Sequence, residues 1–412
     1  MSTVSQTGEI QALISINADK CKGCDACKKF CSTNAIEGAS GAAHSINNDQ
    51  CISCGQCLIN CPFDAIEETH TALDTVIKKL ADPKTQVVGI IAPAVRVAIG
   101  DEFGFDSGEL VTPKLYGAMH QANFNIFDCN FAADLTIMEE GSELIHRLHA
   151  NLNGEADAGK LPQFTSCCPG WVRYLENQYP TLLPNLSTAK SPQQMSGAVA
   201  KTYGAKVYDM DPENIFTVSI MPCTAKKVEA SRPEFNSAWK YHKEHNNAHS
   251  DSYQDVDAVL TTRELAQLFK LLEIDLANVE DFSGDSMFSQ YTGAGTIFGA
   301  TGGVMEAGLR TAYKVLTGEE MAKLELEPVR GLEGVKDTEI TLFDKHLNQE
   351  ITIKVAIVHD MAANIKPILH DVMAGTSPYH FIEVMNCAGG CVNGGGQPID
   401  KSGSAWLGNV TL

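Results

Sequence analysis

Basic residues are scarce in this sequence relative to acidic ones, and long hydrophobic runs are missing. Lys and Arg number 31 against 51 Asp and Glu, which gives the 412 residues a formal net charge of −20. Such a surface keeps a protein in solution, argues against binding nucleic acid or an anionic membrane, and favours a basic protein partner. The apolar run at residues 87–95 contains Gly89 and Pro93 and is too short to span a bilayer, so we expect no membrane-spanning helix. Residues 1–17 lack the basic start and continuous apolar core of a signal peptide, so we expect no export signal in this chain.

Cysteine, in contrast, is abundant, with 14 residues grouped at short spacings that favour metal binding over a secreted disulfide framework. A C-x2-C-x2-C-x3-C run occurs twice, as Cys21, Cys24, Cys27 and Cys31 and as Cys51, Cys54, Cys57 and Cys61. In bacterial ferredoxins, each run gives three ligands to one 4Fe–4S cluster and its last cysteine to the other. We therefore assign Cys61 to the first cluster and Cys31 to the second, with Ile36 and Ile66 packed against them. Paired zinc knuckles are the alternative, but zinc sites do not use this repeat.

After residue 83 the sequence alternates between strand-like and helix-like segments, which is typical of α/β proteins. Strands are predicted at residues 86–92, 125–128, 161–166, 214–220, 339–342, 350–358 and 379–384. Helices are predicted at residues 70–82, 114–122 and 132–152, and others are predicted to begin at Pro169 and Pro192. The polar segment 232–255 is predicted to be a surface insertion whose histidines (His242, His245 and His249) face solvent. Metal binding by these histidines on one helical face is the alternative.

The remaining candidate ligands lie in Pro- or Gly-marked turns after predicted strands, where α/β sheets place their sites: Cys167, Cys168, Cys223, Cys387 and Cys391. One cysteine of the adjacent pair, with the other three, would provide four thiolates for a further cube and leave one cysteine over. Glycines at residues 389–396 would let the backbone approach such a group closely. A single buried cysteine is ordinarily a small apolar residue, but the repetition of this feature at three strand ends favours a cluster.

Three segments resemble the signatures of the iron-only (FeFe) hydrogenases. They are FTSCCPGW at residues 164–171, MPCTAKKVE at residues 221–229 and EVMNCAGGCVNGGGQP at residues 383–398. The resemblance extends over essentially the whole chain, including the ferredoxin-like part. It implies reversible interconversion of dihydrogen with protons and electrons, and the electrons would pass through the two ferredoxin-type clusters. An iron–sulfur assembly or scaffold protein and a hydrogen sensor are the alternatives within the same group of relatives.

The resemblance also implies roles for particular residues. The positions that match the ligands of the catalytic H-cluster are Cys168, Cys223, Cys387 and Cys391. In this family the last of them joins the 4Fe–4S cube to a di-iron subsite with carbonyl, cyanide and a bridging dithiolate amine. Positions that match the surroundings of the di-iron subsite are Lys226, which would hold a cyanide by a charge-assisted hydrogen bond, and Ala92, Pro93, Met221, Phe298 and Met385.

The implied proton relay runs from Glu143 through Ser187, Glu140 and a water molecule to Cys167, which matches the family's proton donor beside the bridging amine. Glu140 and Glu143 are three residues apart and so share one helix face. Without the resemblance they would be read as two acids on a solvated helix. Acids and a thiol at short steps suit proton exchange.

The chain departs from the usual pattern at three positions close to cluster cysteines. Asn386 stands where the family usually has Ala, Ala388 stands before Gly-Gly where the family usually has a different residue, and Ser32 follows Cys31 where a ferredoxin run usually has Pro. Hydrogen bonds at such positions can tune a cluster. The sequence ends 14 residues after Pro398, as in relatives whose tail is a separate small subunit that carries the export signal. We therefore expect a periplasmic heterodimer, with the cytoplasm as the alternative location.

The expected fold class is α+β with α/β: a ferredoxin-like domain with two 4Fe–4S clusters at residues 1–75, then a two-lobed α/β catalytic domain at residues 76–412. The H-cluster is expected between the lobes. Expected partners are the small subunit, a redox protein such as a cytochrome c or ferredoxin, and the maturation proteins that insert the di-iron subsite.

Overall fold

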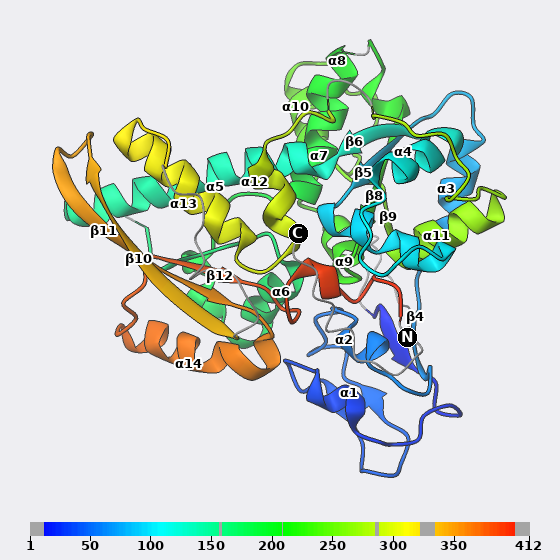
Figure 1. The fold of residues 1–412 in the computed structure, drawn as a ribbon, viewed down its shortest axis with the longest axis horizontal. Coiled ribbons are helices and arrows are strands. Elements are labelled where there is room, and N and C mark those ends of the chain that lie inside the picture. The colour runs from blue at the N-terminus through cyan, green and yellow to red at the C-terminus, as the bar shows by residue number, and fades with distance from the viewer. Residues whose placement is uncertain (1–11, 156–158, 208, 285–287, 322–333, 400–412) are drawn as a thin grey trace.

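The computed structural model describes residues 12–155, 159–207, 209–284, 288–321 and 334–399. Within them the chain forms a small cluster-binding module and two larger lobes, each built on a four-stranded sheet (Figure 1). No helix in these ranges is long and apolar enough to cross a membrane. The expectations about an export signal and a C-terminal tail rest on residues that lie partly or wholly outside the described ranges.

The N-terminal module consists of two short antiparallel pairs and two short helices. Its elements are β1 (Ile14–Ile16) with β4 (Ile66–Glu68), β2 (Ile36–Glu37) with β3 (Ser45–Ile46), α1 (Ala26–Lys29) and α2 (Gln56–Ile59). Tight turns around the cysteines require positive φ, which Gly23 and Gly55 adopt without steric cost. Ile36 and Ile66, which are predicted to pack against the clusters, are buried in the module's core among the cysteines.

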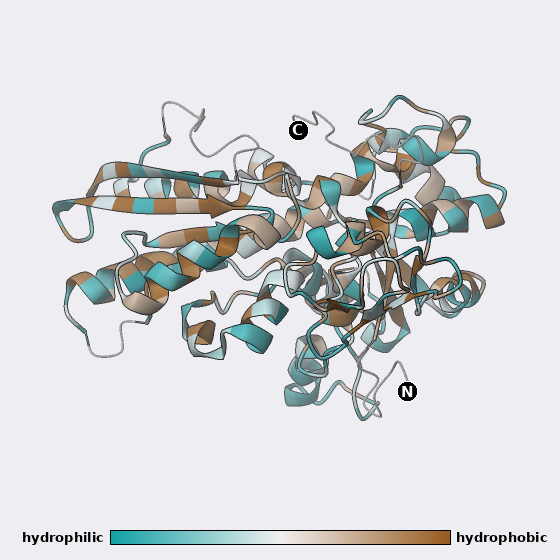
Figure 2. Cartoon of the chain, turned by 90° about the horizontal axis from the view of Figure 1, so that it is seen from below, coloured by the Kyte–Doolittle hydropathy of each residue, from teal (hydrophilic) through white to brown (hydrophobic). Residues whose placement is uncertain are grey.

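The first lobe contains a fully parallel sheet in the order β6-β5-β8-β9. These strands are β5 (Gln86–Ile91), β6 (Asn125–Asp128), β8 (Ile215–Met221) and β9 (Ala258–Thr261). The helices of this half of the chain are α3 (Leu73–Leu80), α4 (Thr112–Gln121), α5 (Cys129–Leu152), α7 (Pro192–Val199), α8 (Ala205–Val207), α9 (Ala225–Ala230), α10 (Ser237–Glu244) and α11 (Thr262–Leu271). The strands of this sheet are almost entirely buried, as a parallel sheet requires, and Figure 2 shows hydrophilic residues gathered on helices and loops at the outside of the molecule.

The second lobe has the strand order β10-β11-β12-β7. Its elements are β7 (Gln163–Phe164), β10 (Val335–Asp344), β11 (Gln349–Val358) and β12 (Phe381–Val384), with α6 (Pro169–Gln178), α12 (Gly293–Thr296), α13 (Gly303–Thr317) and α14 (Met361–Ala374). Alternate residues of β11 face opposite sides of the sheet. Val355 and Ile357 pack in the cluster with α13, whereas Ala356 and Val358 pack in the cluster with α14.

The α/β class and the two-lobed architecture are confirmed, and several predicted bounds agree within a few residues. The strand predicted at residues 161–166 is shorter, because only Gln163 and Phe164 pair with β12. The prediction of a solvent-facing histidine segment is wrong at His242. This side chain is buried in α10, and its Nε2 lies 2.8 Å from the carbonyl oxygen of Lys201, while His245 and His249 are exposed.

Candidate active site

Four strands from the two sheets end at one cavity between the lobes. Strands β5 and β8 reach it from the first lobe, and β7 and β12 reach it from the second. The cavity is lined by all five strand-end cysteines (Cys167, Cys168, Cys223, Cys387 and Cys391) and by Lys226, Ala92, Pro93, Met221, Phe298 and Met385. Sequence positions far apart are thus brought together at the carboxyl ends of strands, where α/β proteins place their ligands.

The chemistry of the cavity suits a group that binds several thiolates at once. Burial raises the pKa of Cys223 and Cys391 to about 12 and raises that of Cys387 well above its ordinary value, and the neighbouring thiols add to these shifts. Metal coordination deprotonates a thiol that would otherwise stay protonated. Within the described ranges, no three His, Cys, Asp or Glu side chains are grouped as for a single metal ion. Thiolates that each bind a different iron of a cube need not converge on one point.

Glycines allow the backbone around Cys391 to fold tightly against the turn after β8. A Cβ atom at Gly394 would lie 2.1 Å from the carbonyl oxygen of Pro222, and one at Gly396 would lie 2.8 Å from the amide nitrogen of Cys223. Gly390 has a φ of +96°, and a Cβ there would lie 2.6 Å from the amide nitrogen of Thr301. A side chain at Gly394 or Gly396 would separate the two cysteine-bearing turns, and one at Gly390 would collide with the backbone of Ala300 and Thr301.

Lys226 reaches the cavity from α9 and is held from both sides. Its Nζ donates to the carbonyl oxygen of Cys167 at 3.0 Å and to Glu229 Oε2 at 2.8 Å. Gln193 Nε2 donates to the same carboxylate oxygen at 2.9 Å and to the carbonyl oxygen of Lys226 at 3.1 Å. The ammonium therefore lies at a defined place in the cavity wall, where it can bind an anionic group.

The predicted relay residues are joined only in part by hydrogen bonds: Ser187 contacts Glu143, and Glu140 contacts the backbone of Ser166, which precedes Cys167. Glu143 Oε2 accepts a hydrogen bond from Ser187 Oγ at 2.7 Å, and Arg147 donates to its other oxygen at 2.6 Å. Glu140 is completely buried, and its Oε1 accepts from the amide nitrogen of Ser166 at 3.1 Å. Burial raises the pKa of Glu140 to about 8. A carboxyl group in this state holds its proton at neutral pH.

The ferredoxin-type cysteines gather into two groups. One cavity is lined by Cys21, Cys24, Cys27 and Cys61. In the other group, burial is the largest cause of the raised pKa of Cys57, and the nearby thiols of Cys54, Cys51 and Cys31, together with Cys27 of the first group, raise it further. The last cysteine of each run thus lies near the first three of the other run, while the assignment of these groups as ligands of two clusters stays a prediction.

The second group is also the one next to the catalytic cavity. The thiol of Cys54 contributes to the raised pKa of Cys387, and a Cβ at Gly395 would lie 2.2 Å from the carbonyl oxygen of Cys54. Gln56 Nε2, from α2, donates to Cys387 Sγ at 3.1 Å and to the carbonyl oxygen of Asn393 at 2.9 Å. Sequence reasoning missed this contact because no local pattern relates Gln56 to Cys387.

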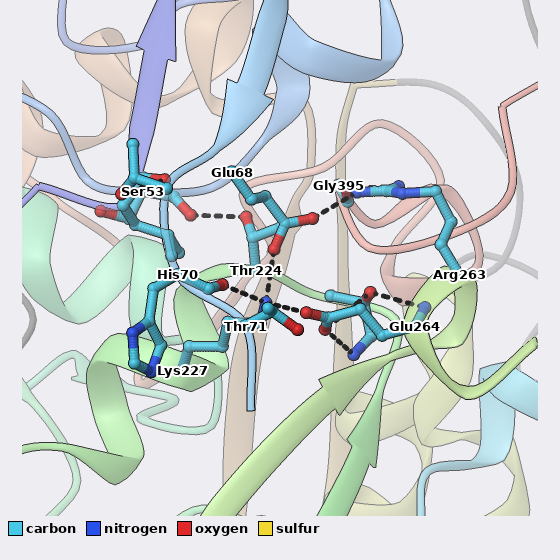
Figure 3. Close-up of polar contacts among 12 residues, drawn as sticks. Ser53, Glu68, His70, Thr71, Thr224, Lys227, Arg263, Glu264 and Gly395 are labelled. Atoms are coloured by element: carbon cyan, nitrogen blue, oxygen red, sulfur yellow. Dashed lines mark hydrogen bonds and ion pairs between the residues drawn. The ribbon is translucent and has the colours of Figure 1, made fainter. Parts of the chain in front are cut away.

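A network of largely buried ion pairs fastens the N-terminal module to the lobe that carries Cys223 (Figure 3). Lys227 Nζ lies 2.6 Å from Glu68 Oε2 and 2.8 Å from Glu264 Oε1. Arg263 donates to Glu68 Oε1 at 2.7 Å and to the carbonyl oxygen of Gly395 at 2.9 Å. The only local signal for this network is the capping box at residues 261–264, which predicts the start of α11 but not its partners.

Comparisons with known proteins agree with this geometry. Residues 85–395 match the family "Iron only hydrogenase large subunit, C-terminal domain", and residues 13–69 match the family "4Fe-4S dicluster domain". The periplasmic Fe hydrogenase large subunit of Nitratidesulfovibrio vulgaris is 48% identical over 94% of this chain and 86% of the relative. Iron hydrogenase 1 of Clostridium pasteurianum is 46% identical over 79% of this chain, and the match spans only 52% of that longer relative.

Solved structures give the same result. A structure of the FeFe-hydrogenase HydA1 from Chlamydomonas reinhardtii is matched with a TM-score of 0.67 at 38% identity, over 80% of this chain and 85% of that one. The family match covers more than half of the chain and includes every strand end that lines the cavity. The chain therefore belongs to the family of iron-only hydrogenase large subunits.

Proposed function

We propose that the chain catalyses the reversible oxidation of dihydrogen, H₂ ⇌ 2 H⁺ + 2 e⁻, at an H-cluster held by Cys168, Cys223, Cys387 and Cys391, with Cys391 as the bridge to the di-iron subsite. The H-cluster supplies the iron centre at which dihydrogen is split or formed. The single observation that carries the proposal is the cavity where these four thiols meet Cys167 and Lys226 at the ends of four strands.

The protein's own groups supply anchoring and water exclusion around that centre. Lys226 would bind a cyanide ligand, because its ammonium is fixed in the cavity wall by Cys167 and Glu229. Ala92 and Pro93 would bring backbone to a second cyanide, and Met221, Phe298 and Met385 would form the apolar wall. These last three side chains are buried, so they exclude bulk water from the reacting centre.

Protons would reach the centre by a path separate from that of the electrons. Glu143, whose side chain is 18% exposed, would take up protons at the surface side and pass them through Ser187, to which it is hydrogen-bonded, to Glu140. Glu140 holds a proton at neutral pH and would pass it by way of a water molecule to Cys167. An assembly factor has no use for such a path, and for this reason we favour catalysis over the scaffold alternative.

Electrons would pass through two ferredoxin-type clusters. Cys21, Cys24, Cys27 and Cys61 would hold the outer cluster, and Cys51, Cys54, Cys57 and Cys31 would hold the inner one, beside Cys387. The proposed division into domains lies between residues 75 and 76, inside α3.

The partners are proposed on the likeness to the periplasmic large subunit of Nitratidesulfovibrio vulgaris. A large subunit implies a small one, so we propose a heterodimer located in the periplasm and exported through its small subunit. We also propose a cytochrome c or a ferredoxin as redox partner, and maturation proteins that insert the di-iron subsite.

The test is an infrared spectrum of the protein produced together with hydrogenase maturation proteins. We expect carbonyl and cyanide bands that change under dihydrogen and under carbon monoxide. Intact iron–sulfur signals without such bands would contradict the proposal, provided that a known hydrogenase matured in parallel shows them. Dihydrogen uptake with an artificial electron acceptor then measures turnover directly.

A further inference from the structure

Two of the chain's departures from the usual pattern meet in the structure. Ser32 follows Cys31 of the inner cluster, and Asn386 precedes Cys387 of the catalytic cavity. Their side chains, 354 positions apart in sequence, form a hydrogen bond of 3.2 Å between Ser32 Oγ and Asn386 Oδ1. Both residues are buried, at 8% and 6% exposure. Pro and Ala, the usual residues, could not form this contact, so the two departures act as a pair.

The same amide faces a cluster thiol. Asn386 Nδ2 lies 3.8 Å from Cys387 Sγ, within the range of a hydrogen bond to sulfur. The orientation of the amide follows from its neighbours: a thiolate accepts only, so it takes the NH₂ side, and Oδ1 then accepts from the Ser32 hydroxyl. Gln56 Nε2 donates to the same sulfur at 3.1 Å. Cys387 is thus approached by two amide donors, and both depend on the N-terminal module.

We propose that Ser32 and Asn386 are a paired tuning element: Ser32 orients the Asn386 amide, which donates to Cys387 Sγ and raises the reduction potential of the catalytic cube. This inference rests on the proposed function, because it assumes that Cys387 binds that cube. A donor to a ligand sulfur stabilises the reduced cluster, which carries more negative charge, and hydrogen bonds to sulfur are among the factors that set such potentials.

The hydrogen bond between Ser32 and Asn386 also links the surroundings of the two clusters. It joins the residue next to a ligand of the inner cluster to the residue next to a ligand of the catalytic cube. The tuning therefore depends on the docked N-terminal module, and a change at Ser32 alters the catalytic cube without touching any of its ligands. A second hydrogen bond crosses the same interface but involves no residue that donates to a sulfur atom. In this bond, Thr224 Oγ1 donates to the carbonyl oxygen of Ser53 at 2.6 Å.

The experiment is a redox titration, followed by electron paramagnetic resonance, of the full chain produced without maturation proteins. The signal of the catalytic cube is the component that disappears in a Cys223→Ala variant. We expect Asn386→Ala to shift this component to a more negative potential. A tenfold fall in the reduced-to-oxidised ratio at fixed potential would correspond to about 59 mV for one electron. Ser32→Ala should shift it in the same direction by less.

Two controls separate the pair from general loosening of the interface. Adding Ser32→Ala to Asn386→Ala should cause no further shift, because Ser32 acts through the amide. Thr224→Val, which removes a bond at the same interface, should leave the component in place. An unshifted component in Asn386→Ala, additive shifts in the double variant, or an equal shift in Thr224→Val would each overturn the inference alone. If the wild-type chain lacks the catalytic cube, so that only the two ferredoxin-type clusters are detected, the proposed function is overturned as well.

Discussion

Replacing Lys227 by Met tests whether the buried ion pairs hold the cluster module in place. The Lys227 side chain is 3% exposed, and its Nζ contacts Glu68 and Glu264, whose side chains are 14% and 11% exposed. Methionine keeps most of the apolar stem but leaves Glu264 without its cation, whereas Glu68 keeps Arg263. Removing one partner of a buried pair costs about 3–5 kcal/mol. At about 1.4 kcal/mol for each factor of ten, this cost is roughly two to four powers of ten in the opening equilibrium of the module.

Hydrogen exchange of the cluster-loaded protein under anaerobic conditions measures this opening. The amides of β1 and β4 should exchange faster in Lys227→Met by roughly two to four powers of ten. The exchange rates of the β5 amides should change much less. Electron transfer to an external acceptor should fall in the matured enzyme. Exchange between dihydrogen and D₂O, which needs only the catalytic centre, should be retained.

The matched control removes the same kind of charge at the surface. Lys270 pairs with Glu102 at 2.7 Å, but its side chain is 52% exposed, so Lys270→Met should cost less than about 1 kcal/mol. Combining Lys227→Met with Glu264→Gln should recover part of the loss, because no uncompensated carboxylate is then buried. If β1 and β4 exchange equally in the Lys227 and Lys270 variants, the network does not fasten the module, and the reasoning fails.

Three further predictions concern the catalytic centre and its proton path. Cys167→Ala should nearly abolish dihydrogen turnover while keeping the infrared bands and the cubes, since Cys167 is proposed to carry protons and no metal; normal turnover would rule out the relay. Cys391→Ala should lose the di-iron subsite, so a variant with a full set of carbonyl and cyanide bands would contradict its role as the bridge. Burial raises the pKa of Glu140 from 4.5 to about 8, so its protonated carbonyl band, identified by its absence from Glu140→Gln, should fade as the pH rises through about 8. Because the folded state holds this proton more tightly, the associated stability is fully present below pH 4.5 and falls between pH 4.5 and about 8, by up to about 1.4 kcal/mol per pH unit. Loss of the band below pH 6 would show that the site is more polar than the structure indicates.

Local patterns in the sequence predicted much of the fold because the physical rules behind them act over a few residues. The strand at residues 125–128 and the helix that begins at Pro169 agree with the structure. Short, nearly continuous apolar runs predict strands wherever both faces of a sheet are buried. They fail at β7, where only two residues pair with a neighbour. The polar composition of residues 232–255 led to the wrong prediction at His242, which is buried against the carbonyl oxygen of Lys201, 41 positions away.

The sequence alone determined the chemistry of this protein, and the tertiary structure decided its arrangement. Ligand spacing is a property of short turns, so the two ferredoxin runs and the cysteine-bearing strand ends could be recognised without coordinates. The contacts of Gln56 with Cys387 and of Glu68 with Arg263 span 331 and 195 positions. Such contacts form only when packing of the module against the lobes has already brought the partners within hydrogen-bond range. For the same reason the pairing of Ser32 with Asn386 was visible only in the folded chain: each residue is a minor departure in its own segment, and the buried interface joins them.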